Sequence, residues 1–323
     1  MSKSVFVTLL LVLTSIVSCQ EGPKRRYLAD SNGNMNHLTV VMEESDWNGE
    51  LGKTTRKLLE TPYEGLPLIE PQFSLKHLSP KVFSGFARNS RNVLWFQKDT
   101  IARFQLIENY FARPQIVAIV KGEDREVQAV FLEENIRLLR ATLSENELKE
   151  KLRRIQKSPS RDKELSDRFK VRLVYPTAYK TVKDTTNFIW IQKPVQKGHL
   201  NIIAYSLPEN ELIGNTKKKI IEIRDSIGKV YVPGRLKGSF MITEKAYRPY
   251  FYKTKSDNKF SYLTKGTWEV ENDFMAGPFI NYMIKDTVNK RWMVLEGFSF
   301  APSISKRDYM FELNTILSSI RFE

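Results

Sequence analysis

The sequence predicts an α+β fold made of two tandem related units, with largely antiparallel sheets and flanking helices. Three observations support this prediction. Several segments alternate apolar and polar residues with a period of two, which is typical of strands. Only a few segments show the apolar stripe of an amphipathic helix. Strands and helices do not alternate regularly, so the pattern of a βαβ fold is missing.

The predicted strands are of two kinds. Leu38 to Met42 and Phe169 to Tyr175 alternate, and each would bury one face. Short apolar runs predict strands that are more deeply buried. These runs are Val93 to Phe96, Ile116 to Val120, Val127 to Phe131, Phe188 to Ile191, Leu200 to Tyr205, Ile280 to Ile284 and Trp292 to Leu295.

Apolar stripes or capping signals predict helices in three places. A C-terminal helix begins at Ser305 as N-cap, with Asp308 three residues on. Its apolar stripe is Met310, Leu313, Ile316, Leu317 and Ile320. A second stripe is stopped at Gly228 and consists of Leu212, Thr216, Ile220, Ile223 and Ile227. Residues 133–156 predict one broken helix or two, with Ser144 and Glu147 as a capping box at the join.

An internal similarity suggests that the two units are related. Residues 37–60 align without gaps onto 199–222, and both segments predict a strand followed by a helix. A second match aligns 108–121 with 271–285, in the same order along the chain. We therefore expect a first α+β unit at 37–157, a linker at 158–168 and a second unit at 169–323. A chance similarity between β-rich segments is the alternative.

The N-terminal residues predict a lipoprotein signal peptide at 1–18. Lys3 precedes a thirteen-residue apolar run, Val5 to Val17, which suits a signal peptide and is too short to span a bilayer comfortably. Ile16-Val17-Ser18-Cys19 resembles a lipobox, and Cys19 is the only cysteine. We expect lipid on Cys19, a flexible polar tether at 19–36, and a location in the cell envelope, on the periplasmic face of either membrane or on the cell surface.

The formal net charge of +14 is consistent with an anionic partner. Export argues against nucleic acid, and an anionic envelope surface suits this charge better. Because the basic residues are dispersed, a lysine-rich solvated surface is the simpler explanation.

No catalytic, metal or cofactor motif is found, so catalytic residues, a metal and a cofactor are not predicted. Exposed Tyr247, Tyr250 and Tyr252 would form a binding surface for a protein or glycan partner, although strand packing also explains them. Four Asp-Ser/Thr-apolar triplets resemble bacterial O-glycosylation sites, and turn chemistry is the alternative. Their acceptors are Thr100, Thr185, Ser226 and Thr287.

The lipobox, Val40-Val41-Met42-Glu43, Phe83-Ser84-Gly85-Phe86 and Gly277-Pro278-Phe279-Ile280 resemble a lipoprotein family of the Bacteroidota known as a domain of unknown function. Val171 to Pro176 and Leu317 to Phe322 resemble the PsbP and Mog1 type of domain, which implies a binding or assembly module. The expected function is a non-catalytic envelope module. A hydrolase acting on glycan or peptide, or a carrier of an apolar ligand, are the alternatives.

Overall fold

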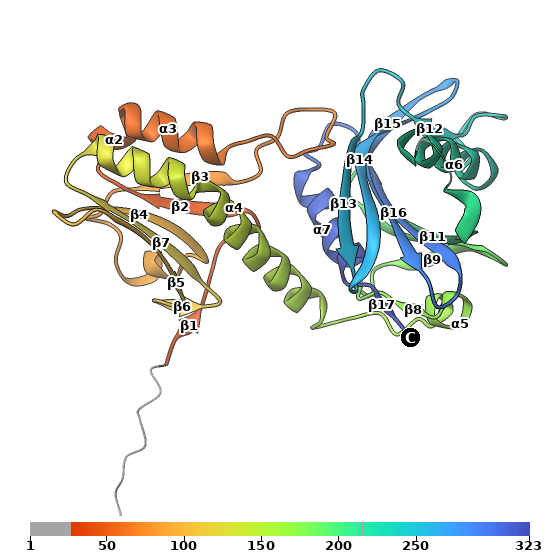
Figure 1. The fold of residues 1–323 in the computed structure, drawn as a ribbon, viewed down its shortest axis with the longest axis horizontal. Coiled ribbons are helices and arrows are strands. Elements are labelled where there is room, and N and C mark those ends of the chain that lie inside the picture. The colour runs from red at the N-terminus through yellow and green to blue at the C-terminus, as the bar shows by residue number, and fades with distance from the viewer. Residues whose placement is uncertain (1–26, 213, 215) are drawn as a thin grey trace, which may run out of the picture.

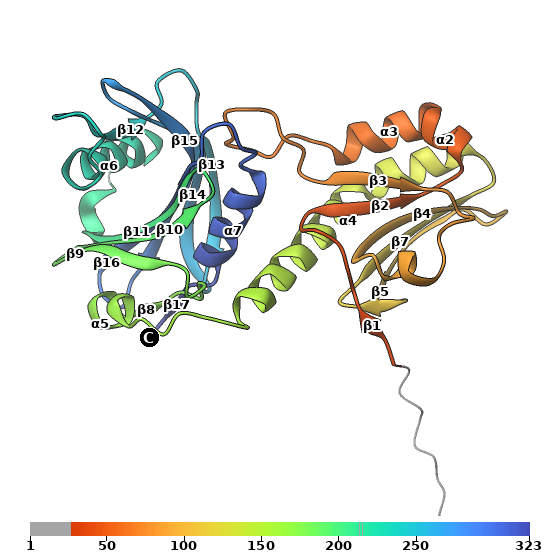
Figure 2. The ribbon, with the colours of Figure 1, turned by 180° about the vertical axis from the view of Figure 1, so that it is seen from behind.

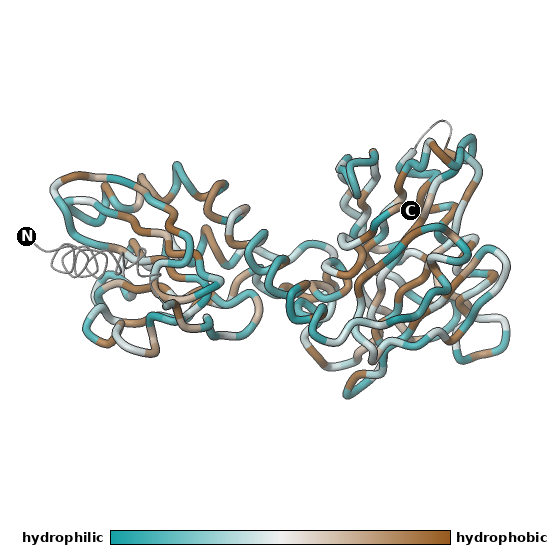
Figure 3. The backbone as a smooth tube through the Cα atoms, turned by 90° about the horizontal axis from the view of Figure 1, so that it is seen from below, coloured by the Kyte–Doolittle hydropathy of each residue, from teal (hydrophilic) through white to brown (hydrophobic). Residues whose placement is uncertain are grey.

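The computed structural model describes residues 27–212, 214 and 216–323 and contains two units (Figure 1). The predicted α+β class is confirmed, because the described residues form 17 strands and 6 α-helices. Figure 2, seen from behind, and Figure 3, seen from below, show the same two bodies joined at a narrower region. The predicted signal peptide and Cys19 lie outside the described residues.

The first unit contains a five-stranded sheet in the order β3-β2-β4-β7-β5. Its strands are β2 (His37–Val41), β3 (Ser74–Leu78), β4 (Asn92–Lys98), β5 (Arg103–Glu108) and β7 (Ile116–Gly122), beside a short pair, β1 (Ala29–Asp30) and β6 (Ala112–Arg113). Its helices are α2 (Glu44–Asn48), α3 (Glu50–Leu59) and α4 (Arg125–Ile155), with the 3-10 turn η1 (Gly85–Asn89). Helices α3 and α4 pack on one face of the sheet (Figure 1), where buried leucines, Leu51, Leu132 and Leu139 among them, form the core.

The sheets of the described residues are largely antiparallel, as predicted, but the sheet of the first unit is mostly parallel. Strand β2 is parallel to β3 and β4, β4 is parallel to β7, and only β5 is antiparallel to its neighbour. The apolar runs at Val93 to Phe96 and Ile116 to Val120 are the central strands β4 and β7. Both faces of these strands are covered, and such continuous apolar runs are typical of parallel sheets.

Helix α4 is a single helix of 31 residues, so the predicted break at Ser144 and the predicted strand at Val127 to Phe131 are wrong. The helix is capped by Asp124, whose side chain accepts the N–H of Val127. Glu147 is fully buried rather than part of a capping box. Its carboxylate receives hydrogen bonds from Arg91 Nε at 2.6 Å and from the Asn36 backbone N at 2.5 Å.

The second unit contains an eight-stranded antiparallel sheet, ordered β12-β14-β15-β16-β11-β10-β9, with β13 also paired to β14. Its strands are β9 (Lys180–Thr185), β10 (Phe188–Val195), β11 (Gly198–Pro208), β12 (Met241–Thr243), β13 (Tyr250–Ser256), β14 (Lys259–Val270), β15 (Asp273–Asp286) and β16 (Arg291–Phe300), and a separate pair joins β8 (Val171–Arg172) to β17 (Arg321–Phe322). Its helices are α5 (Glu164–Phe169), α6 (Thr216–Tyr231) and α7 (Arg307–Ser318), with the 3-10 turn η2 (Glu209–Glu211).

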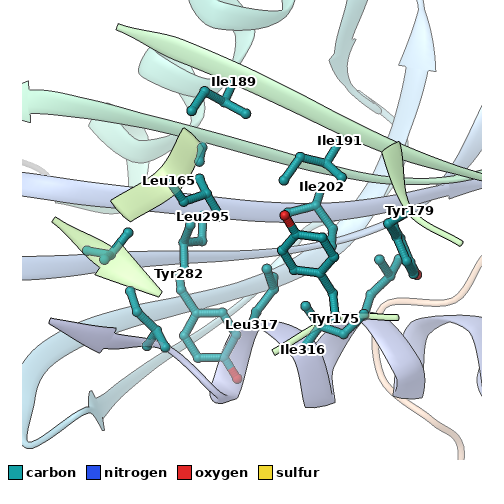
Figure 4. Close-up of a cluster of buried hydrophobic side chains, with 14 of the residues drawn as sticks. Leu165, Tyr175, Tyr179, Ile189, Ile191, Ile202, Tyr282, Leu295, Ile316 and Leu317 are labelled. Carbon is teal, nitrogen blue, oxygen red and sulfur yellow. The ribbon is translucent and has the colours of Figure 1, made fainter. Parts of the chain in front are cut away.

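Helix α7 covers one face of this sheet, and its predicted apolar stripe is confirmed. All five stripe residues are buried, with at most 3 % exposed. They pack on Ile191, Ile202 and Leu295 from the central strands (Figure 4). The backbone of α7 approaches closely at Gly297, where a Cβ would lie 3.0 Å from Leu313 Cβ.

Helix α6 covers the opposite face and does not stop at Gly228. It continues to Tyr231, and Gly228 lies inside it. A Cβ at position 228 would lie 2.0 Å from the carbonyl oxygen of Met241. Glycine is therefore present because strand β12 passes directly against the helix backbone, not because the helix ends.

The two units are not equivalent, which corrects the predicted duplication. Strand β2 is parallel to both neighbours, whereas the aligned strand β11 is antiparallel to both. Residues 44–46 are helical in α2, whereas the aligned residues 206–208 are extended in β11. The sequence match therefore reflects a shared local strand-then-helix pattern.

Two predicted boundary segments carry structure of their own. Residues 29 and 30 of the predicted tether form β1, paired with β6, and Asn36 is buried. The end of the predicted linker forms α5, which inserts Leu165 and Phe169 into the core of the second unit. The polar composition of the segment predicted a linker, because Leu165 and Phe169 are the only apolar residues of α5.

The units are joined by polar contacts around α7. Lys151 on α4 forms an ion pair with Glu312 on α7 at 2.7 Å. Glu312 also binds Lys193 and accepts a hydrogen bond from Tyr179 OH at 2.9 Å. The loop between α3 and β3 reaches the start of α7, where Glu70 accepts backbone hydrogen bonds.

Candidate functional site

A cleft of about 140 Å³ lies on the α6 face of the second sheet. We call it the aromatic cleft. Strands β10, β11, β14, β15 and β16 form its floor, and the segment after α6 together with β12 forms its wall. The lining residues are Trp190, Gln192, His199, Asn201, Val232, Pro233, Met241, Trp268, Val270, Met275, Phe298 and Phe300. His199 is the only titratable side chain among them, and most of the other lining side chains are apolar or aromatic.

Four aromatic rings follow one another across the floor. Trp190 and Phe298 have ring centroids 6.1 Å apart, and Phe298 meets Trp268 edge-on at 5.8 Å. Phe300 lies 6.2 Å from Trp268. Edge-on and tilted pairs at such distances are favourable ring arrangements. The rings come from strands β10, β14 and β16, so only the folded sheet brings them together.

Asn201 positions Trp190 at one end of this row. The side chain of Asn201 is 2 % exposed. Its amide oxygen accepts hydrogen bonds from Trp190 Nε1 at 3.0 Å and from Gln192 Nε2 at 2.9 Å. The indole N–H of Trp190 is therefore satisfied within the protein.

Trp268 differs from Trp190 in the hydrogen bonding of its indole N–H. Its side chain is buried, and its indole Nε1 has no hydrogen-bond partner among the described residues. The indole lies against Gly277 on the neighbouring strand, where a Cβ would come 3.0 Å from Nε1. A buried donor without a partner is uncommon and costs roughly 1–3 kcal/mol. The nitrogen is closed off from solvent and faces the neighbouring strand, so it is not an open donor in the cleft.

A buried ion pair holds α6 over the sheet beside the cleft. Arg224 of α6 binds Glu296 of β16 at 2.8 Å, and both side chains are at most 2 % exposed. Asn281 donates a second hydrogen bond to Glu296 at 2.9 Å. The guanidinium also lies 3.8 Å from the ring centroid of Phe279. This network fixes the helix whose end leads into the cleft wall.

The three tyrosines predicted as a binding surface do not line the aromatic cleft. Tyr247 and Tyr250 are exposed. Tyr252 donates a hydrogen bond to Glu64 of the first unit at 2.7 Å. Burial and this contact with Glu64 raise the pKa of Tyr252 to about 12. Tyr252 therefore joins the two units.

The four predicted glycosylation acceptors occupy different environments. Thr100 and Thr287 are exposed in turns, and Thr185 is half-buried at the end of β9. Ser226 lies within α6, where its hydroxyl donates to the carbonyl of Glu222 at 2.8 Å. The alternative explanation by turn chemistry does not hold for this triplet, because the segment is helical.

Two further features bear on chemistry and attachment. Within the described part of the chain, no group of three His, Cys, Asp or Glu side chains is placed to hold a metal ion. No helix in this part is both long and apolar enough to cross a membrane.

Two family models match the chain in tandem. Residues 31–156 match a domain of unknown function, DUF8532, and residues 158–319 match a domain of unknown function, DUF4837. The chain belongs to the DUF4837 family. The DUF4837 domain is the second unit and contains the aromatic cleft. No curated protein matches the chain.

Two solved structures show weak similarity. Cyanobacterial PsbP from Synechocystis is 11 % identical with a TM-score of 0.33, and covers 48 % of this chain and 87 % of its own. LpqN of Mycobacterium tuberculosis, described as involved in cell envelope biogenesis, is 12 % identical with a TM-score of 0.29, and covers 46 % and 81 %.

The sequence did not reveal the aromatic cleft of the DUF4837 domain. Trp190, Trp268 and Phe298 are far apart in the chain and lie on three different strands. One local signal was present: Phe298 and Phe300, spaced by two on a strand, must face the same side. Register between strands then decides which other rings join them.

Proposed function

We propose that this chain is an envelope lipoprotein, anchored through lipid on Cys19, that acts as a non-catalytic binding module through its aromatic cleft. The observation that carries the proposal is the row of four aromatic rings on the floor of the cleft. Apolar pockets with a few placed polar groups are typical of binding sites.

The cleft defines the chemistry of its ligand. Its volume of about 140 Å³ is well below the roughly 300–1,000 Å³ of sites that enclose whole small molecules. It therefore fits one ring-sized group, such as a side chain or sugar ring of a larger partner. The group would present an apolar or aromatic face that packs on Phe298 and Phe300.

Anchoring is supported by the sequence alone. A short apolar run, a small residue before Cys19 and a polar segment after it fit a lipobox. Two or more acyl chains would hold the protein stably, at roughly 0.8 kcal/mol per buried CH₂. The lipobox and the family resemblance favour the envelope of a member of the Bacteroidota.

The cleft is tested by NMR of the indole groups. The chain has five tryptophans, so ¹⁵N labelling of the indole nitrogen gives five signals. The probes are p-cresol, benzamide and a methyl glycoside at millimolar concentration. We expect at least one probe to shift the Trp268 Nε1–H signal, because a group packed on the cleft floor changes the magnetic environment of the indole. A Trp268 signal that no probe moves would overturn the proposed binding site.

Two matched substitutions assign the binding to the cleft. Trp268→Phe reduces a ring of the cleft floor, and Trp47→Phe makes the same change in α2 of the first unit. We expect only Trp268→Phe to weaken binding of the active probe, by about two- to tenfold in Kd, because it removes ring area from the cleft. Equal weakening by both variants would show that the probe does not bind through the cleft.

The anchor is tested by fractionation. Wild-type protein should incorporate a fatty-acid probe, lack residues 1–18 and stay with membranes in high salt. Cys19→Ala should abolish labelling and either release the protein or leave an unprocessed precursor. A wild-type protein that is unlabelled and soluble would refute the anchor without affecting the cleft.

A further inference from the structure

A second cavity, of about 320 Å³, lies between the two units. We call it the interunit cleft. Helix α4 contributes Arg140 and Ser144, the α3–β3 loop contributes Tyr63 and Gln72, and the second unit contributes Lys265 and Asn314. Contacts between domains are favoured places for ligands, and this volume falls within the usual range for small-molecule sites.

The charges in the interunit cleft do not balance. Its charged lining residues are Glu64, Arg140 and Lys265. Lys265 pairs with Glu64 at 3.2 Å. Arg140 is half-buried and has no carboxylate partner among the described residues. Its one hydrogen bond runs to the neutral Gln72 Oε1 at 3.3 Å. The cleft thus carries one uncompensated positive charge.

Other donors beside Arg140 are also free. Asn314 uses its amide oxygen to accept from Tyr282 OH at 2.7 Å, and its amide N–H groups have no partner among the described residues. The Tyr63 hydroxyl likewise has no hydrogen-bond partner there. Gln72 is held in place because its amide donates to Ser144 Oγ at 2.9 Å. The unused hydrogen-bonding capacity is therefore mostly that of donors.

We infer that the interunit cleft binds an oxyanion, a carboxylate or phosphate group, with Arg140 as its charge partner and Asn314 as a donor from the other unit. A guanidinium presents paired N–H donors that match either group. Because its donors come from both units, the bound anion would also stabilise their contact. This site is separate from the aromatic cleft.

Calorimetric titration of the full chain tests the inference. The free-anion probes are citrate and inorganic phosphate, with chloride at equal ionic strength as the reference for screening. Vesicles of phosphatidylglycerol in phosphatidylcholine test a lipid headgroup as the source of the oxyanion. We expect saturable binding to at least one probe and a higher unfolding temperature when it is bound.

Matched variants assign the binding to this cleft. Arg140→Gln should weaken binding by about tenfold or more, because it removes a charge-assisted hydrogen bond. Arg137→Gln makes the same charge change on an exposed position of α4 and should leave binding unchanged. Asn314→Asp keeps an acceptor for Tyr282 and places a negative charge in the cleft, so it should also weaken binding.

The outcomes are decisive. Loss of citrate or phosphate binding in Arg140→Gln, but not in Arg137→Gln, supports a free anion as ligand. The same pattern with vesicles alone supports a lipid headgroup. Absence of saturable binding to every probe, or equal losses in both arginine variants, overturns the inference.

Discussion

Glu70 of the first unit caps the helix that begins at Arg307 in the second. Its two carboxylate oxygens accept the backbone N–H of Lys306 at 2.7 Å and of Arg307 at 2.9 Å. Arg307 in turn binds the first unit, because its guanidinium donates a hydrogen bond to Ser74 Oγ at 2.7 Å. Helix α7 therefore takes its N-terminal cap from the other unit, and the expected cap, Ser305, makes no such bond.

Glu70→Ala should lower the free energy of unfolding by about 1–2 kcal/mol, since helix caps contribute about 0.5–2 kcal/mol and a carboxylate also interacts favourably with the helix dipole. Glu134→Ala, which removes an exposed carboxylate on α4, is the matched control and should change stability little. Denaturant unfolding measures both. Equal stability of the two variants would show that the cap contributes nothing.

Leu313→Ala should lower the free energy of unfolding by about 2–5 kcal/mol, because the side chain is fully buried between α7 and the sheet. Leu138→Ala makes the same change at a position that is 54 % exposed and should cost less than about 0.5 kcal/mol. Similar costs for the two variants would contradict the burial of the α7 stripe.

Gly228→Ala should destabilise the protein, although alanine normally favours a helix by about 1 kcal/mol over glycine. The reason is steric, since the added Cβ would meet the Met241 carbonyl at 2.0 Å. Thermal unfolding gives the sign directly. A stabilised variant would mean that β12 does not press against α6.

The contact around Glu312 should make stability depend on pH. Burial of Glu312 opposes its ionisation, but Lys151 and Lys193 outweigh burial and hold the pKa of this carboxyl below its usual value. A carboxyl with a lowered pKa in the folded state stabilises the protein above the unfolded-state pKa of about 4.3. That contribution disappears as the pH falls through the folded-state pKa.

The pKa values of Asp286 and Glu150 are also lowered, so these carboxyls change stability with pH in the same direction. Glu312→Gln isolates the contribution of Glu312. We expect the variant to be less stable than wild type at pH 7, with the difference shrinking as the medium becomes acidic. Unfolding free energies measured across this pH range test it. A difference that stays constant with pH would show that the charge of Glu312 is not responsible.

Much of the local structure followed from the sequence. The α7 stripe from Met310 to Ile320 is buried as predicted, because a helical period fixes which side chains share a face. Strands such as β10 and β16 coincide with the apolar runs at Phe188 and Trp292. Sequence patterns gave the wrong element where a helix and a strand can share one pattern. The apolar run at Val127 is part of a helix, not a strand.

The sequence by itself determined the α+β class and most of the helices and strands, because these depend on residues close together in the chain. Tertiary structure alone decided the parallel pairing of β2 with β4, the cap that Glu70 supplies to α7, and the ring row through Trp268 and Phe298. Each of these depends on residues far apart in sequence. Whether such residues meet in space depends on strand register and on how α4 packs against α7. No local sequence pattern encodes either of these.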